Sequence, residues 1–364
     1  MKKLILFFAI LALAIVACQD NSEEITPNQE VTAIDMSDFY VYTDDDNLSA
    51  KGTSDSHGDK CHSMKVLNRQ LKENPGLENR MYNIELRTRK AIAAKGKPSK
   101  PGNGGGGGGT DPEPTIYSGS VTIPVVINII EQNTGQVTDA QISSQITILN
   151  EDFNDNNPNT SSTPNYFSSL IANTDITFVL ADVNRKVSNK SSWGTRDTMK
   201  NSKRGGISPT DPANNLNIWV CEIGGGILGY AQFPGGSSST DGVVITTSAF
   251  GENTAGGVYG DGRTATHEVG HWLNLRHIWG DGGCSVDDFV ADTPVAGGPN
   301  YGGPNGTCQG EVNSCNEGSG DLPDMTMNYM DYVYDDCMYM FTNGQNDRMR
   351  TLFGTGGARE SFVQ

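Results

Sequence analysis

Three of the five histidines in this 364-residue chain fall within eleven residues, in the segment His267-Glu-Val-Gly-His271-Trp-Leu-Asn-Leu-Arg-His277. Residues four apart share one face of a helix, so His267 and His271 can present two imidazole nitrogens to one metal ion. Glu268 lies beside the first of them and can reach a water molecule without being a ligand. His277 completes three ligands only if the helix ends before it and the chain turns back. The segment predicts a helix, a sharp turn and a zinc site with one open position.

The alternative for these histidines is an ordinary place in a protein core, because the pattern His-Glu-x-x-His also arises by chance. The two remaining histidines, His57 and His62, lie far upstream, before a glycine-rich stretch. All three histidines after the glycine-rich stretch, His267, His271 and His277, therefore have the spacing of metal ligands. This restriction favours a metal site with Glu268 as general base.

The composition limits the class of protein without deciding its function. The chain has 44 glycines, 35% hydrophobic residues and a formal net charge of −17. This acidity argues against a nucleic-acid surface, which requires an excess of Lys and Arg. It fits a soluble extracellular protein, including one that holds divalent cations.

The N-terminus predicts export. Residues 1–17 combine a basic start with an apolar run that is short for a membrane span, which is typical of a signal peptide. The run ends Ile15-Val16-Ala17-Cys18, which resembles the lipobox of bacterial lipoproteins. That resemblance implies a lipid anchor on Cys18 and a cell-surface protein of the outer membrane. The alternative is an ordinary signal peptide and an extracellular protein.

The rest of the chain divides by composition and periodicity into four segments. A run of six glycines cannot bury a core and marks the clearest boundary. The predicted segments are an acidic tether at 18–60, a helical hairpin at 61–100, a Gly/Pro-rich linker at 101–115 and a globular domain at 116–364.

Within residues 116–364 the pattern predicts an α/β or α+β half followed by an irregular half rich in Gly and Cys. Thr138 and Thr342 each begin a helix with a capping box formed with the Gln three residues later. The late cysteines can form two disulfides in an oxidising compartment, and spacing alone leaves three pairings open. Apolar and β-branched runs predict strands at 121–130, 176–180, 216–220, 229–234 and 243–247.

Together with the histidine segment, several stretches resemble the metzincin zinc metalloproteases, most closely the pappalysin/cytophagalysin family. The resemblance implies a two-lobed catalytic domain with a mixed twisted sheet, active-site helices and a disulfide-braced C-terminal lobe, with an active-site cleft between the lobes. The activity it implies is zinc endopeptidase cleavage of protein or peptide substrates. The similar stretches are Leu149–Asn154, Leu216–Val220, Gly229–Pro234, Asn328–Tyr332 and Phe341–Gln345.

The resemblance assigns roles around the zinc. Met330 would give the histidines an apolar floor, and the hydroxyl of Tyr332 would stabilise the oxyanion together with zinc while Glu268 moves the proton. The family glycine in the turn is Asn274 here, and Asn is the non-Gly residue that best tolerates the left-handed backbone needed there. Substrate would lie extended along the strand around residues 230–233.

Other positions carry weaker signals. The resemblance implies structural calcium at Asp287, Asp288, Asp292 and Thr293, where the residues alone indicate a solvated acidic loop. It also implies the disulfides Cys284–Cys315 and Cys308–Cys337. Asp335 matches a position at the bottom of the pocket for the residue after the scissile bond, where an acid would favour Arg or Lys; otherwise it is a surface Asp.

Residues 61–100 resemble the pro-segments of the family. Cys61 could then place a thiolate on the zinc and keep the enzyme latent, with release by cleavage among the basic residues 87–100. The alternative for Cys61 is an idle thiol. A rival class, a non-catalytic calcium-dependent surface binding protein, would explain the anchor, the acidity and the disulfides. It leaves the three histidines and Glu268 unexplained.

Overall fold

The computed structural model describes residues 33–42, 60–96, 113–316, 318 and 320–364. The predicted signal peptide, Cys18 and most of the tether and linker lie outside these residues. Residues 36–364 form one compact unit. Among the helices of the described part of the chain, none is long and apolar enough to cross a membrane.

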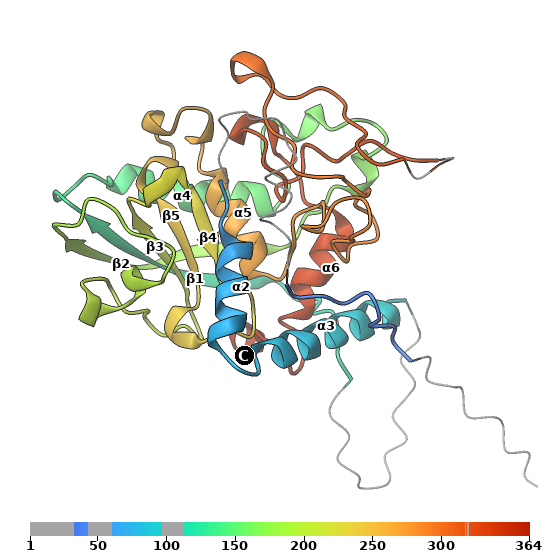
Figure 1. Cartoon of the computed structure of the whole chain (residues 1–364), viewed down its shortest axis with the longest axis horizontal. Coiled ribbons are helices and arrows are strands. Elements are labelled where there is room, and N and C mark those ends of the chain that lie inside the picture. Colours follow the sequence, from blue (N-terminus) through green and yellow to red (C-terminus); the bar gives the residue numbers. More distant parts are fainter. Residues whose placement is uncertain (1–32, 43–59, 97–112, 317, 319) are drawn as a thin grey trace, which may run out of the picture. The chain divides into compact units, whose positions relative to one another are not determined.

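A five-stranded sheet forms the first lobe, with the strand order β2-β1-β3-β5-β4 (Figure 1). All neighbouring strands are parallel except β4, which runs antiparallel to β5 at one edge. The sheet is therefore mixed, as the family resemblance implies. The strands are β1 (Val121–Glu131), β2 (Ile176–Val187), β3 (Leu216–Cys221), β4 (Gly229–Ala231) and β5 (Val243–Thr246).

Buried side chains lie on both faces of the central strand β3, because successive side chains of a strand point to opposite faces. Ile218 and Val220 of β3 join the core that holds α4 (Asp139–Phe153) and α5 (Arg263–Trp272). Trp219, between them, joins a second cluster on the other face with Met199 and Tyr230. The sheet thus holds α5 beside the edge strand β4.

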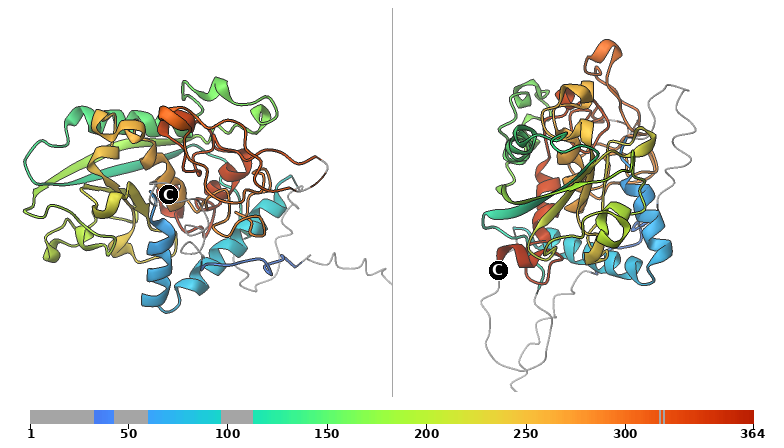
Figure 2. Two further views of the ribbon diagram at one scale, coloured as in Figure 1. Left: turned by 45° about the horizontal axis from the view of Figure 1, so that its top comes forward. Right: turned by 90° about the vertical axis from the view of Figure 1, so that its left-hand side faces the viewer.

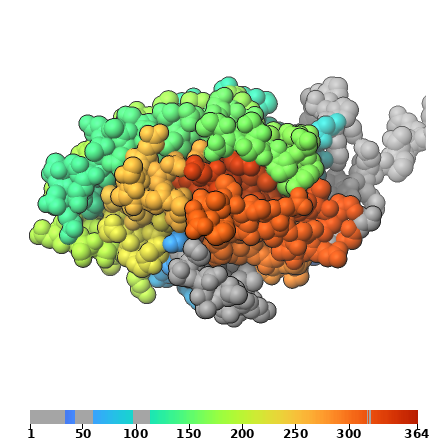
Figure 3. Space-filling view, turned by 90° about the horizontal axis from the view of Figure 1, so that it is seen from above, coloured from blue at the N-terminus to red at the C-terminus, as the bar shows by residue number. Residues whose placement is uncertain are grey.

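The second lobe has little regular structure and follows α5 in the chain. Its one long helix is α6 (Asn343–Thr351), whose capping box at Thr342 forms as predicted, like the one at Thr138. Two disulfides, Cys284–Cys315 and Cys308–Cys337, close its loops, which is the pairing that the family resemblance implies. Figure 3 shows this lobe, in orange and red, as a continuous surface beside the green and yellow sheet lobe.

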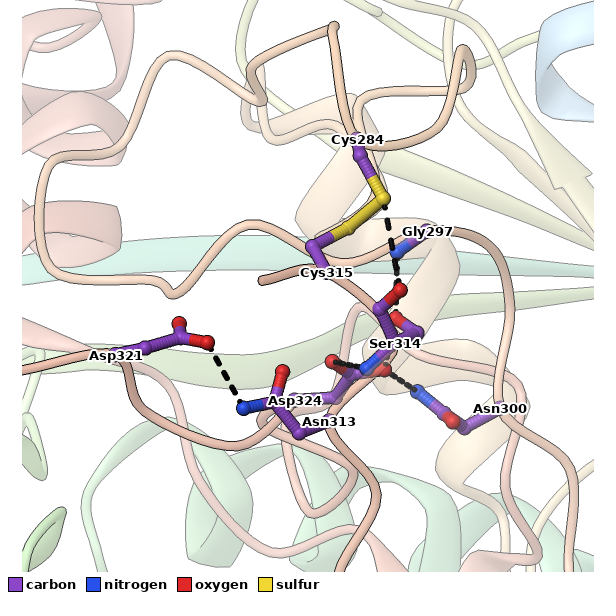
Figure 4. Close-up of a disulfide and its surroundings, with 8 residues drawn as sticks. All are labelled: Cys284, Gly297, Asn300, Asn313, Ser314, Cys315, Asp321 and Asp324. Carbon is purple, nitrogen blue, oxygen red and sulfur yellow. Dashed lines mark hydrogen bonds between the residues drawn. A yellow bond between two sulfur atoms is a disulfide. The ribbon is translucent and has the colours of Figure 1, made fainter. Parts of the chain in front are cut away.

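A buried polar network supports the first disulfide (Figure 4). Ser314 precedes Cys315 and donates its hydroxyl to Asp324 at 2.6 Å. The Asn300 amide donates to Asp324 at 3.4 Å and to Asp331 at 2.9 Å. Asp331 also accepts the backbone N–H of Tyr332, so the network reaches the turn that carries Met330 and Tyr332.

Two helices precede the sheet in the chain, α2 (Ser63–Glu73) and α3 (Leu77–Ala94), joined at Gly76, whose φ of 88° is left-handed. Figures 1 and 2 show α2 beside β4 and α5, and α3 beside α6. The helical hairpin predicted for this region is therefore packed across both lobes. Buried contacts include Leu67 and Leu71 of α2 with Phe233.

Two strand boundaries differ from the sequence prediction. β2 continues to Val187 instead of ending at Leu180, since it keeps pairing in parallel with β1 although most of its later side chains are not buried. β4 is only three residues long, Gly229–Ala231, where the sequence predicts a strand to Pro234. Apolar periodicity therefore misplaced the ends of two edge strands.

Candidate active site

Helix α5 carries His267, Glu268 and His271, and all of its residues are buried. Gly270 faces the floor of the site. A Cβ on Gly270 would lie 2.4 Å from the Met330 sulfur, so a larger residue here would push the Met330 side chain away from the helix. Met330 is fully buried beneath the helix, the place expected for it.

The turn after α5 reverses the chain in the way the third histidine requires. Asn274 has a φ of 73°, in the left-handed region expected at this position. The N–H of Asn274 donates to the His271 carbonyl at 2.9 Å, and the N–H of Leu275 donates to the Gly270 carbonyl at 3.0 Å. These bonds end the helix and return His277 toward it.

The three imidazoles meet at one point. The Nε2 atom of His271 lies 3.1 Å from Nε2 of His267 and 3.1 Å from Nε2 of His277. Each Nδ1 faces an oxygen: the Tyr329 carbonyl at 2.7 Å from His267, the Leu275 carbonyl at 2.8 Å from His271, and the Asp281 carboxylate next to His277. With Nδ1 protonated toward these acceptors, each Nε2 keeps a lone pair aimed inward.

Burial keeps the imidazoles of His267 and His271 neutral. It lowers the pKa of His267 to about 3, with a further contribution from the nearby His277, and it lowers the pKa of His271 for the same reasons. Neutral imidazole is the form that binds a metal ion. Three inward nitrogens with hydrogen-bonded partners behind them fit zinc, which favours nitrogen and sulfur donors in tetrahedral sites.

Glu268 lies beside the ligands without belonging to them. Its Oε2 accepts the Ser63 hydroxyl at 2.7 Å, and its buried Oε1 has no hydrogen-bond partner among the described residues. Burial raises the pKa of Glu268 to about 7. A Cβ on Gly229 would lie 3.0 Å from Oε1, so the glycine at the start of β4 leaves room for the carboxylate. The group suits proton exchange near neutral pH.

Tyr332 and Cys61 complete the surroundings of the histidines. The Tyr332 ring lies 4.9 Å from the His277 ring, and its hydroxyl donates to the Cys61 carbonyl at 3.3 Å. One ligand atom from each of Cys61, His267, His271 and His277 lies within 4.8 Å of the others. The structure therefore brings the thiol to the three nitrogens.

Asp335 lies in a pocket beside the histidines. His267, Glu268, Tyr332, Tyr259 and Lys60 also line this pocket. The Oδ2 atom of Asp335 accepts the backbone N–H groups of Asp261 at 2.9 Å and Arg263 at 3.2 Å. Burial raises the pKa of Asp335 to about 7. The carboxyl group is therefore part of the site rather than a surface side chain.

The four residues expected to hold calcium do not all converge. Asp288 accepts the Thr293 hydroxyl at 2.9 Å, and Asp287 lies beside it. Asp292 instead accepts the Thr342 hydroxyl at 2.6 Å and the Gly344 N–H at 2.8 Å, at the N-terminus of α6. Asp292 thus caps a helix, where a carboxylate is stabilised by free N–H groups.

Several site residues escaped sequence analysis. Asp281 orients His277, and its only sequence signal is its spacing of four residues after a ligand. Asp152 accepts hydrogen bonds from Thr266 of α5 at 2.7 Å and from the Tyr329 hydroxyl at 2.8 Å, which ties the helix to the methionine turn. Ser63 has no sequence signal, because its bond to Glu268 joins residues 205 positions apart.

Comparison with known proteins agrees with this geometry. The peptidase family model described as pregnancy-associated plasma protein-A matches residues 212–353. The extracellular metalloprotease 1 of Coccidioides posadasii is 34% identical over 240 residues, which cover 63% of this chain and 74% of the relative. The chain belongs to the pappalysin family of metzincin metalloproteases.

Another fungal protein and two solved structures are also similar to this chain. The extracellular metalloprotease of Arthroderma benhamiae is 32% identical and covers 65% of the chain and 73% of the relative. Mature mirolysin of Tannerella forsythia with a cleaved peptide is 43% identical with a TM-score of 0.63, covering 68% of this chain and 96% of mirolysin. A promirolysin mutant from the same organism is 36% identical with a TM-score of 0.68, covering 83% and 96%.

Proposed function

We propose that this metalloprotease is made as an exported latent precursor whose residues around Cys61 occupy its own active site. The observation that carries the proposal is the convergence of three inward Nε2 atoms with the Cys61 thiol, next to the unpartnered Oε1 of Glu268. His267, His271 and His277 would hold zinc, and Glu268 would act as general base.

Zinc bound there would polarise the scissile carbonyl and make a water molecule more acidic. Glu268 takes the proton of that water and delivers it to the leaving amine, which a carboxyl group with a pKa of about 7 can do. The Tyr332 hydroxyl donates to the carbonyl oxygen as that oxygen gains charge. The Cys61 carbonyl, 3.3 Å from the Tyr332 hydroxyl, marks a place that a carbonyl oxygen can take.

Substrate would pair with the edge strand β4 as an added strand. The precursor's own chain already does this. The Leu228 N–H donates to the Lys60 carbonyl at 2.8 Å, and the His62 N–H donates to the Gly229 carbonyl at 3.0 Å. An extended backbone therefore fits between β4 and the histidines.

Latency would rest on three contacts of the pro-segment. The Cys61 thiol would take the open position on zinc, the Ser63 hydroxyl engages Glu268, and Glu85 of α3 pairs with Arg348 of α6 at 2.7 Å. The larger coverage of this chain by promirolysin than by mature mirolysin, 83% against 68%, supports a precursor of the same layout. Removal of this segment would free the cleft.

The Asp335 pocket would favour Arg or Lys after the scissile bond. Lys60 of the pro-segment lines the same pocket and places its ammonium 5.4 Å from the centre of the Tyr259 ring. A pocket that holds a lysine beside a carboxyl group and an aromatic ring suits a cationic substrate side chain. Peptides with Arg, Lys or Leu after the cleaved bond test this, and equal cleavage of all three would contradict it.

Calcium and membrane attachment complete the proposal. A calcium ion would bind near Asp287, Asp288 and Thr293, with Asp292 left to cap α6. A thermal midpoint that ignores Ca²⁺ would count against this site. Export is supported by the fungal relatives, which are named extracellular metalloproteases. A lipid on Cys18 would be seen by labelling with a fatty-acid analogue, and absence of label would leave a freely secreted enzyme.

The test of the main proposal is casein digestion by the processed protein, with zinc measured alongside. Wild type should contain one zinc per chain and be inhibited by a zinc chelator. Glu268→Ala, which must be processed by added wild-type enzyme because it cannot process itself, should keep the zinc and lose at least about 10²-fold in kcat, the lower range for general-base catalysis. A metal-free processed protein, or near-normal turnover of Glu268→Ala, would overturn the assignment.

A further inference from the structure

A second groove lies at the opposite end of β4 from the Asp335 pocket. Leu228, just before β4, lines the Asp335 pocket, and Gln232, just after β4, lines the groove. The loop of residues 196–209 forms one wall, and α2 forms the other through residues that include Arg69 and Gln70. The groove therefore lies along the path of the substrate strand.

The loop wall is strongly basic in an acidic protein. Seven of the twelve Lys and Arg residues of 116–364 fall between positions 185 and 204, where Asp197 is the only acid. Arg196, Lys203 and Arg204 line the groove and are exposed. None of these three side chains forms an ion pair with another residue that the structure describes. Their charges are available to a ligand.

The pro-segment separates this groove from the cleft. The Gln70 amide donates to the Gln232 side chain at 3.1 Å, and the Ala231 N–H donates to the Ser63 hydroxyl at 2.7 Å. Both contacts lie on the edge that a substrate would use. A peptide that replaces the pro-segment along β4 would therefore run directly into the basic groove.

The direction of the substrate follows from the two pockets, and this step rests on the proposed function. If the Asp335 pocket takes the residue after the scissile bond, the other end of β4 faces residues before that bond. Gln232 lies four positions after Leu228, which is about 13 Å of extended chain. The groove would thus meet side chains about three to five residues upstream of the cleaved bond.

We infer that the basic groove formed by Arg196, Lys203 and Arg204 is a substrate subsite that selects acidic residues three to five positions before the scissile bond. The preferred substrate would then combine acidic residues upstream with Arg or Lys just after the cut. Opposite charges at the two ends of the cleft would fix the register of the peptide as well as its affinity.

The groove also contains one site for a cation, which makes the opposite preference a real alternative. Arg69 of the pro-segment donates to the buried Asp197 carboxylate at 2.5 Å and to the Thr195 carbonyl at 3.2 Å. The buried Lys200 ammonium already lies 3.1 Å from the same carboxylate. Without Arg69 this pair is neutral, so the three exposed cations set the charge that a substrate meets.

The test uses the full chain after its own processing and three fluorogenic peptides that share an Arg after the cleaved bond. The peptides carry Glu, Ala or Lys at the third to fifth upstream positions. Wild type should cleave the Glu peptide with about fivefold higher kcat/KM than the Ala peptide in low salt, and the ratio should approach one in 0.5 M NaCl.

A triple variant, Arg196→Gln with Lys203→Gln and Arg204→Gln, should bring the Glu/Ala ratio near one. Arg185→Gln removes a charge that lies outside the groove and is paired with Asp139 and Glu131, and it should keep the wild-type ratio. Equal cleavage of Glu and Ala peptides by wild type, or a preference for Lys through Asp197, would overturn the inference. Failure to cleave any peptide would instead overturn the proposed peptidase.

Discussion

The proposed zinc site lies between the catalytic domain and the proposed pro-segment, and these two sides are built differently. On the catalytic side, α5 and its turn are held by the core of the sheet, by Met330 and by hydrogen bonds behind each histidine. On the pro-segment side, many of the anchoring contacts are polar, such as Ser63–Glu268 and Glu85–Arg348. A packed core persists after cleavage, whereas the polar groups of a departing segment can exchange their partners for water. This difference fits a catalytic domain that stays folded after cleavage and a pro-segment that dissociates from it.

Substitutions on the catalytic side should act mainly on turnover of the processed enzyme. Tyr332→Phe removes the hydroxyl proposed to stabilise the oxyanion and should lower kcat of the processed enzyme about 10²-fold or more, with KM little changed. Tyr339→Phe removes a hydroxyl bonded to the distant Ser162 carbonyl and is the matched control. Steady-state kinetics decides, and an unchanged kcat in Tyr332→Phe would remove this role.

Substitutions on the pro-segment side should affect latency and leave turnover intact. Glu85→Gln breaks a buried bidentate pair with Arg348 and should weaken docking of the pro-segment by about 3 kcal/mol. The precursor should then process itself faster, while the processed enzyme is unchanged. Glu78→Gln, at an exposed position on the same helix, is the control. Equal processing times for Glu85→Gln and wild type would show that the pair does not hold the pro-segment.

The same pair should respond to acid. Burial alone would raise the pKa of Glu85, but the charge and hydrogen bonds of Arg348 and hydrogen bonds from Arg89 lower it from 4.5 to about 2. Because the folded pKa is depressed, the pair stabilises the precursor above about pH 4.5 and loses this contribution as pH falls toward 2. The difference in Tm between wild type and Glu85→Gln should therefore shrink over that range. A constant difference would contradict the ion-pair explanation.

A smaller effect is expected in the turn between the ligands. Asn274→Val places a β-branched residue at a φ of 73° and should cost about 1–2 kcal/mol and weaken zinc binding, whereas Asn274→Gly should keep both zinc and activity. Zinc titration and thermal unfolding of the two variants measure this. A fully active, zinc-replete Val variant would refute the turn geometry.

The smallest effect is expected at Ser63. Ser63→Ala removes one hydrogen bond to Glu268 and one from the Ala231 N–H, and should shorten the latent period modestly, by about 1 kcal/mol of docking. Ser63→Thr can keep the hydroxyl and serves as the control. A Ser63→Ala precursor as slow as wild type would leave latency to the remaining contacts.

The sequence predicted the parts of the site that depend on local spacing. His267, Glu268 and His271 lie on one helix. The turn after it was expected at Asn274, because Asn tolerates positive φ. The capping boxes at Thr138 and Thr342 were also predicted from local pattern and form as expected. The irregular second half followed from composition, whereas the mixed sheet was implied by the family resemblance.

Other features depend on contacts between distant residues, which spacing cannot reveal. Asp281 and Asp152 act through hydrogen bonds set by the fold, and Ser63 meets Glu268 only because the pro-segment docks beside β4. Asp292 was expected to bind calcium, yet it caps α6, since composition does not say which way a loop carboxylate points. The end of β2 was missed because its later side chains are mostly not buried and give no apolar signal.

X-ray absorption at the zinc edge tests most directly whether one metal is shared by three imidazoles and the Cys61 thiol. The latent chain should bind one zinc with three nitrogen neighbours near 2.0 Å and one sulfur near 2.3 Å, and the sulfur should vanish on processing. A latent chain without stoichiometric zinc, or a zinc shell without sulfur, would contradict the account.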